Sequence, residues 1–168
     1  IKTLPQREFL AGYAEVVKYG IINDLNFFNY LDKNLATILK HDNIVLQKTI
    51  KTSCEAKAKI VAEDEREGGV RALLNFGHTF AHALEKATGY SDKLLHGEAV
   101  AIGMVFAMKL SHKMGLCDAA DVDKVEAHLK NSGLKTSPLQ IQKDWDKSEL
   151  ISAMYQDKKA FNGKLTFI

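Results

Sequence analysis

Apolar residues recur every three or four positions along most of this chain, which is the period of an α-helix with one buried face. The stretches with this spacing are residues 8–22, 25–38, 44–62, 74–85, 98–114 and 118–131, with a last one around 150–154. Residues 98–114 are apolar on nearly every side of the helix, so we expect this helix to lie at the centre of the fold. The pattern therefore predicts a helical protein.

Residues that typically begin helices support these boundaries. They stand before several of the helices and comprise Pro5, Asp24, Asp42 and, for the last helix, Asp146 or Ser148. Near the other end of the chain, residues 165–168 (LTFI) have the composition of a β-strand, with no partner strand elsewhere in the sequence. We therefore expect an all-α fold, one helical domain over residues 1–168, with a short strand at its C-terminal end.

Composition narrows the class of protein. The chain has 168 residues, of which 46% are apolar and 26% charged, as in an ordinary soluble domain. A net charge of +2 is too small to indicate a nucleic-acid partner, and no apolar run is long enough to span a membrane. The two cysteines, Cys54 and Cys117, are far apart, and without a signal peptide they indicate reduced thiols in a cytosolic protein. Because the chain begins with Ile and ends in an unpaired strand, we expect it to be part of a longer protein.

The chemistry is concentrated in residues 74–85, where two histidines stand in an apolar run. His78 and His82 are four residues apart, so they share one helix face, and Asn75, three before His78, is expected to join that face. A third histidine, His96, lies where the next apolar helix begins. Neutral imidazole is a good ligand for zinc and similar ions. Two histidines at this spacing are also common on ordinary helices, so a metal site and a plain helix face both remain open.

Other polar residues have simpler interpretations. Glu15 and Lys18 are three apart and would form a surface ion pair. The charge-dense segment 63–71 is typical of a surface loop, although a carboxylate there could also act in acid–base chemistry. His41 and His128 have no partners nearby in the sequence and are expected at the surface. No glycine-rich phosphate loop is present.

Six short stretches together form a more specific pattern. They are KTLPQRE at 2–8, AEVVKYGII at 14–22, the segment from Asp64-Glu65 to Arg71, NFGHTF at 75–80, LHGEAV at 95–100 and DKK at 157–159. In this order they resemble the 3-dehydroquinate synthases, metal-dependent cyclases of the shikimate pathway, over nearly the whole chain. The resemblance implies an N-terminal α/β domain that binds NAD and a C-terminal helical domain that binds the metal and most of the substrate. This chain resembles the second domain only, and the family is commonly homodimeric.

The resemblance also implies roles for individual residues. Those that match the metal ligands, for Zn²⁺ or Co²⁺, are Glu15, His78 and His96. Those that match substrate contacts are Lys18, Lys57, Arg71, Asn75 and Lys159, with Lys158 the less favoured neighbour of Lys159. Those that match positions for proton transfer are Glu67 and His82. Those that match the end of an NAD-contacting segment are Lys2 and Thr3.

The reaction implied is the conversion of 3-deoxy-D-arabino-heptulosonate 7-phosphate, a small-molecule substrate, to 3-dehydroquinate and phosphate. NAD would oxidise a hydroxyl transiently, phosphate would leave, and the ring would close after the hydride returns. The cationic residues suit a ligand with a phosphate and a carboxylate. Without the NAD-binding domain, the chain alone is expected to be inactive.

Two positions depart from the family pattern, and three other functions compete with the one just described. Ala81 stands where the family usually has glycine, and Ala11 stands where it often has a polar residue. The first alternative is another sugar phosphate cyclase, such as a 2-deoxy-scyllo-inosose synthase. The second is a metal-dependent alcohol dehydrogenase of the glycerol dehydrogenase type, and the third is a helical domain without catalysis.

Overall fold

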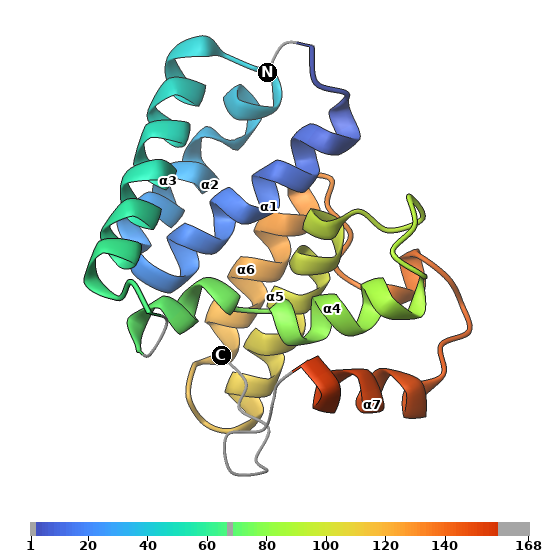
Figure 1. The fold of residues 1–168 in the computed structure, drawn as a ribbon. Coiled ribbons are helices and arrows are strands. Elements are labelled where there is room, and N and C mark those ends of the chain that lie inside the picture. The colour runs from blue at the N-terminus through green and yellow to red at the C-terminus, as the bar shows by residue number, and fades with distance from the viewer. Residues whose placement is uncertain (1–2, 67–68, 158–168) are drawn as a thin grey trace.

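The computed structural model describes residues 3–66 and 69–157, and within these residues all regular structure is helical. The helices, in chain order, are α1 (Gln6–Asn23), α2 (Leu25–Leu39), α3 (Asn43–Glu63), the 3₁₀ helix η1 (Val70–Asn75), α4 (His78–Ala87), α5 (His96–Lys113), α6 (Ala119–Asn131), the 3₁₀ helix η2 (Pro138–Gln140) and α7 (Lys147–Asp157). Figure 1 shows their arrangement. The all-α prediction is confirmed for this part of the chain, and the strand expected at 165–168 lies outside the described residues.

Side-chain caps begin three of the helices at the predicted places. The carboxylates of Asp24, Asp42 and Asp146 each accept hydrogen bonds from backbone N–H groups in the first turn that follows. Ser148, the alternative cap for the last helix, lies inside α7. Each cap satisfies backbone donors that have no partner within the helix. The helix boundaries therefore follow from short-range chemistry.

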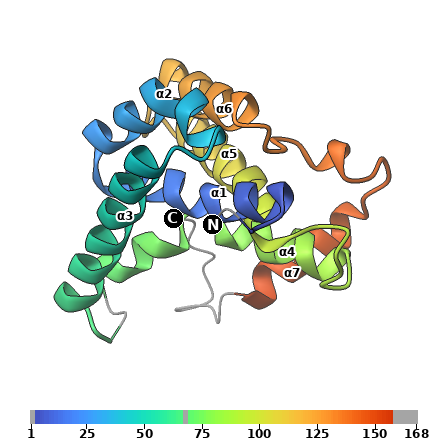
Figure 2. The same cartoon turned by 90° about the horizontal axis from the view of Figure 1, so that it is seen from above.

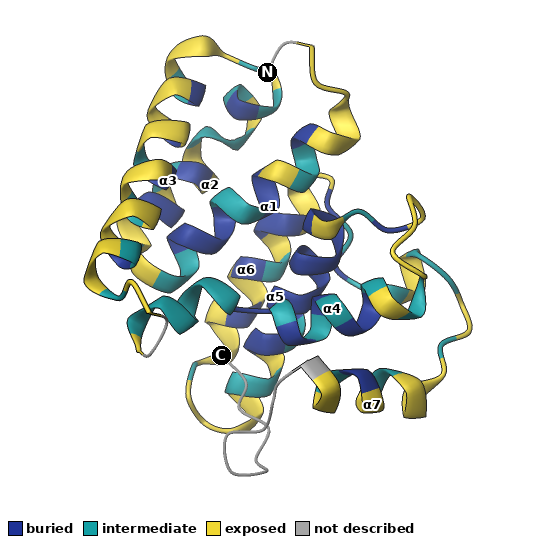
Figure 3. Ribbon diagram, in the orientation of Figure 1, coloured by how far each residue is buried: buried dark blue, intermediate teal, exposed yellow. Residues whose placement is uncertain are grey.

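Helix α5 forms the centre of the fold. It packs against α1, α4 and α6, and from above it lies between α6 and α4 (Figure 2). Every residue from 97 to 105 is buried, which appears as continuous dark blue in Figure 3. The central position predicted from its apolar pattern is thus confirmed. No helix among residues 3–66 and 69–157 has the length and apolar character needed to cross a bilayer.

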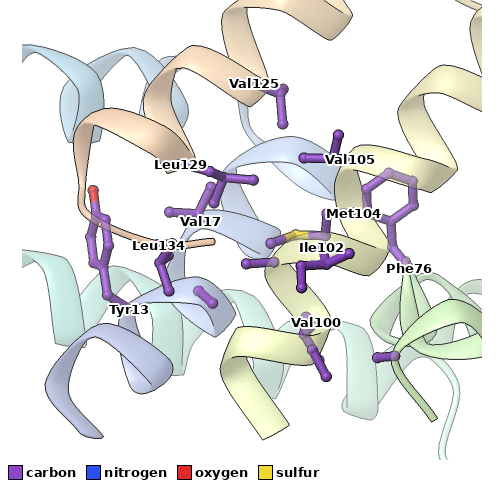
Figure 4. Packing of buried hydrophobic residues seen from close by; sticks show 14 of the residues in the cluster. Tyr13, Val17, Phe76, Val100, Ile102, Met104, Val105, Val125, Leu129 and Leu134 are labelled. Atoms are coloured by element: carbon purple, nitrogen blue, oxygen red, sulfur yellow. The ribbon is translucent and has the colours of Figure 1, made fainter. Parts of the chain in front are cut away.

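The core forms where α1, α5 and α6 meet. Figure 4 shows Val17, Ile102 and Leu129, one from each of these helices, converging in the interior, and each is fully buried. Burial of an aliphatic side chain of this size contributes roughly 1.5–3 kcal/mol to folding. This packing fixes α1 against α5, which matters because both helices contribute to the site described below.

Two glycines on α5 allow neighbouring backbones to approach very closely. A Cβ atom placed on Gly97 would lie 1.9 Å from the carbonyl oxygen of Ala11 in α1. A Cβ on Gly103 would lie 2.1 Å from the carbonyl oxygen of Gly77, the residue just before α4. Ala81 is fully buried beside this second contact. The glycines therefore bring the middle of α1 and the start of α4 against α5.

Candidate metal centre

Three potential metal ligands from separate segments converge beside the start of α5. Glu15 lies in the middle of α1, and His78 and His96 are the first residues of α4 and α5. One ligand atom from each lies within 4.8 Å of the others. The Glu15 Oε1 atom is 3.8 Å from Nε2 of His78 and 3.8 Å from Nε2 of His96. Ligand atoms around a tetrahedral ion with bonds of about 2.1 Å are about 3.4 Å apart, so this spacing is close to that of a metal site.

Hydrogen bonds orient both imidazoles toward Glu15. The Nδ1–H group of His78 donates to the carbonyl oxygen of Phe76, at 3.2 Å. The Nδ1–H group of His96 donates to the carboxylate of Glu85, at 3.0 Å. With Nδ1 occupied in this way, the lone pair of each neutral ring is on Nε2, the atom that faces Glu15.

The contacts of the Glu15 carboxylate leave one of its two oxygens without a partner. Its Oε2 atom accepts a hydrogen bond from Lys18 Nζ at 2.6 Å. Its Oε1 atom is buried and has no hydrogen-bond partner among the residues that the structure describes. Leaving a buried carboxylate oxygen unsatisfied is costly, and a divalent cation between two imidazoles and this oxygen would satisfy it. Two histidines and one carboxylate form a donor set that suits a catalytic zinc ion with an open position.

Burial also shapes the charge states at the site. Burial lowers the pKa of His78, with the positive charge of Lys18 acting in the same direction, and this favours the neutral imidazole that binds metals. The hydrogen bond that His96 donates to the Glu85 carboxylate raises the pKa of His96, against the effect of burial. Burial lowers the pKa of Lys18. The ion pair with Glu15 expected from the sequence is present, but it does not lie fully at the surface, because the side chain of Lys18 is only 4% exposed and that of Glu15 is 31% exposed.

Further polar side chains lie around these ligands. The ring of His82 lies 5.5 Å from the ring of His78 and 6.3 Å from that of His96, between centroids. Lys57 is exposed on α3, and its positive charge contributes to lowering the pKa of Lys18. Helix η1, which contains Arg71 and Asn75, contacts both α1 and α3. Of these polar side chains, His82 is the one whose measured contacts place it directly beside both candidate ligand histidines.

Comparison with known proteins places the chain in a family. A family model described as 3-dehydroquinate synthase C-terminal matches residues 12–160, most of the chain. The chain belongs to this family. Two curated relatives named 3-dehydroquinate synthase are 51% identical over 170 residues, in Rhodospirillum rubrum, and 52% identical over 167 residues, in a Ruegeria species. They match 100% and 99% of this chain but only 44% and 45% of their own length, so the chain spans less than half of them.

Solved structures of two cyclases have the same fold as this chain. One is a 2-epi-5-epi-valiolone synthase from Streptomyces hygroscopicus with NAD⁺ and Zn²⁺ bound, with a TM-score of 0.80 and 24% identity over 92% of this chain. The other is a 2-deoxy-scyllo-inosose synthase with carbaglucose-6-phosphate, NAD⁺ and Co²⁺, with a TM-score of 0.72 and 31% identity over 99% of this chain. The chain covers 42% and 44% of these two proteins.

Some of the predicted site residues lie close together in the structure. Glu15, His78 and His96 converge as expected. Arg71 is half-buried in η1 and donates through Nη1 to the carbonyl oxygen of Glu65, at 2.8 Å. Thr3 is exposed just before α1. The predicted residues that lie outside the described residues are Lys2, Glu67, Lys158 and Lys159.

The positions expected for three further residues were wrong. Asn75 does not share a helix face with His78, because Gly77, with a φ of +79°, separates η1 from α4. His128 is not at the surface: it is 1% exposed, accepts a hydrogen bond from the Tyr13 hydroxyl at 2.9 Å and donates to Asp32 at 2.8 Å. Its polar atoms could enter the core because α1 and α2 provide partners for both ring nitrogens. The other histidine expected at the surface, His41, is also partly buried, against the ring of Phe9.

Two polar features near the candidate metal centre were not predicted from the sequence. One is Glu85, which follows His78 by seven residues and His82 by three, a spacing that places it on the same helix face. The other is the ion pair between Arg7 and Glu98, at 2.7 Å, in which Glu98 also accepts from the backbone of Leu95 at the start of α5. The first could have been found from helix periodicity, whereas the second joins segments 91 residues apart.

Proposed function

We propose that this chain is the metal- and substrate-binding part of a 3-dehydroquinate synthase. The enzyme converts 3-deoxy-D-arabino-heptulosonate 7-phosphate to 3-dehydroquinate and phosphate. The main support is the convergence of Glu15, His78 and His96 in a chain whose relatives of that name are 51% and 52% identical over its whole length. Because those relatives are more than twice as long as the part they share with this chain, the activity is proposed for a longer protein.

The proposed metal ligands are Oε1 of Glu15 and Nε2 of His78 and His96. The unsatisfied Glu15 oxygen and the orientation of both rings support this assignment. The two cyclase structures contain Zn²⁺ and Co²⁺, and we infer the same choice of ions here. A divalent ion in this position supplies Lewis-acid chemistry, polarising an oxygen on the substrate carbon that is oxidised.

NAD is proposed as the second cofactor, bound mainly by another part of the longer protein, with Lys2 and Thr3 as contacts from this chain. The cyclase structures contain NAD⁺. Among the described residues, only the exposed Thr3 belongs to the predicted cofactor contacts, and no glycine-rich phosphate loop is present in the sequence. The curated relatives extend well beyond the part shared with this chain, and we propose that the NAD-binding domain lies in that remainder.

The side chains around the ligands have the charges that this substrate needs. Lys18, Lys57 and Arg71 are cations that would bind the phosphate and carboxylate groups, and Asn75 would donate an amide hydrogen bond. His82, beside both ligand histidines, would move a proton through a ring nitrogen as phosphate leaves. We assign the same classes of role to Lys159 and Glu67, on the resemblance alone.

The experiment that tests this proposal compares two histidine variants in the complete protein. His78→Ala should lose bound metal and at least a hundredfold in turnover, because it removes one of three ligands. The matched control is His112→Ala, since His112 is exposed near the other end of α5. Metal content and phosphate release from the heptulosonate phosphate would be measured for both. Equal losses in the two variants, or normal metal content in His78→Ala, would contradict the proposed centre.

A second candidate function is supported by one structural comparison. The 2-deoxy-scyllo-inosose synthase structure is 31% identical to this chain and holds a glucose 6-phosphate analogue. The higher identity of the named 3-dehydroquinate synthases favours the first assignment. Phosphate release from glucose 6-phosphate, but not from the heptulosonate phosphate, would reverse it. A homodimeric assembly and a cytosolic location also remain predictions.

A further inference from the structure

A carboxylate outside the predicted site holds one of the proposed ligands. Oε1 of Glu85 lies 3.0 Å from Nδ1 of His96, and the Glu85 side chain is only 12% exposed. The His96 side chain is 50% exposed, whereas that of His78 is 13% exposed. His78 is therefore held by its surroundings, while His96 has room to rotate about its side-chain bonds. The hydrogen bond that His96 Nδ1–H donates to Glu85 restricts this rotation.

We propose that Glu85 is a positioning residue of the metal centre, which selects the tautomer and orientation of His96. The Nδ1–H group of His96 donates to the Glu85 carboxylate, and this leaves the lone pair on Nε2, directed at Glu15 Oε1 at 3.8 Å. A carboxylate that accepts from the second nitrogen of a ligand histidine fixes that ring and strengthens it as a ligand. The inference rests on the proposed function, because it assumes that His96 binds the metal.

Helix α4 makes this arrangement rigid. Glu85 and the ligand His78 are seven residues apart on α4, so two turns of one helix place them on the same face. The helix packs along α5, which begins at His96. A single rigid element therefore supplies one ligand directly and the orientation of another. A displacement of α4 would disturb both at once.

The competing explanation is an ordinary ion pair that joins α4 and α5. A partly exposed pair of this kind contributes about 0–1 kcal/mol to stability and has no specific effect on metal binding. The two explanations predict different metal affinities for variants of equal stability. They also predict different positions for the ring proton of His96 when no metal is present.

The experiment measures Co²⁺ and Zn²⁺ affinity of the 168-residue chain by titration, with the Co²⁺ absorption spectrum as a report on ligand geometry. Glu85→Ala should weaken metal binding 10–100-fold and alter the spectrum, with little change in the thermal midpoint of the metal-free chain. Glu85→Gln keeps an oxygen that accepts from Nδ1–H and should recover most of the affinity. The matched control is Glu126→Ala, which breaks a 2.7 Å ion pair between α6 and Lys109 of α5. Its metal affinity should be unchanged.

The ring proton is observed directly by ¹⁵N NMR of the metal-free wild-type chain at a pH of about 8.5, well above the usual pKa of histidine. We expect His96 as the Nδ1–H tautomer. The Nε2–H tautomer in the wild type would overturn the inference whatever the variants do. Equal affinity of the wild type and Glu85→Ala would also overturn it while leaving the metal centre intact. A wild-type chain that binds neither ion would instead overturn the metal centre of the proposed function.

Discussion

Gly97→Ala is the substitution for which the structure predicts the clearest loss of the metal centre. Gly97 follows the proposed ligand His96, and its helix contacts the backbone of α1 at this point. The added Cβ would lie 1.9 Å from the carbonyl oxygen, 2.4 Å from the carbonyl carbon and 2.6 Å from the Cα atom of Ala11. All three atoms belong to the backbone, so no side-chain rotation can relieve the contact.

The size of the effect follows from these distances. Ordinary contact begins at 3.4 Å, so α1 and α5 must separate by about 1.5 Å where they cross. Overpacking of this kind costs about 1–3 kcal/mol, and more when only backbone can move. The same separation would lengthen the 3.8 Å gap between Glu15 Oε1 and His96 Nε2 to about 5 Å. One ion with bonds of about 2.1 Å cannot span that gap.

A glycine in α1 provides the matched control. Gly12 is exposed, and a Cβ placed on it meets no atom within 4 Å among the described residues. Gly12→Ala should raise stability by about 0.5–1 kcal/mol, since alanine loses less entropy in a helix. We expect Gly97→Ala to lower the free energy of unfolding by about 2 kcal/mol and the Co²⁺ affinity by at least tenfold.

Urea denaturation of the metal-free chain and Co²⁺ titration would measure the two quantities for both variants. If Gly97→Ala kept wild-type stability and bound Co²⁺ within twofold of the wild type, the close approach of α1 and α5 would be wrong. So would the argument that this approach sets the ligand geometry.

Three further predictions concern charge and the division of the protein. Burial lowers the pKa of His128, whose ring faces Tyr13 from α1 and Asp32 from α2, so the neutral ring favours the folded state. Its contribution to stability should be complete above a pH of about 6.5 and be lost below it, by up to about 1.4 kcal/mol per pH unit. Thermal midpoints of the wild type should therefore fall more steeply from pH 7 to 5 than those of His128→Gln, and parallel curves would contradict this. Glu98→Ala should destabilise the chain by about 1–3 kcal/mol in urea, because it removes the ion pair with Arg7 and the acceptor of the Leu95 amide at the start of α5; no change would count against the contact. Finally, the 168-residue chain supplied with NAD, zinc and the heptulosonate phosphate should release no phosphate, and turnover near that of the complete protein would refute the proposed division between domains.

The helices could be predicted from the sequence because the interactions that define them are local. The period of apolar residues identified α1 through α7, and the aspartates at 24, 42 and 146 marked three of their starts. The central position of α5 followed from its lack of a polar face. The apolar period predicted one continuous helix across Gly77, but the positive φ of this residue ends η1 before α4 begins. Neither helix period nor residue type shows such a change of backbone direction.

The metal centre depends on contacts that no local pattern contains. The spacing of His78 and His82 suggested a site, and resemblance to a known family added Glu15 and His96. Only the packing of α1 and α4 against α5 brings Glu15, His78 and His96 within 4.8 Å of one another, although Glu15 is far from both histidines in sequence. The burial of His128 was decided in the same way, by partners on two other helices. Helical hydrogen bonds join residues that are close in the sequence, so the sequence predicts them. Burial and ligand geometry arise from contacts between segments that are distant in the sequence.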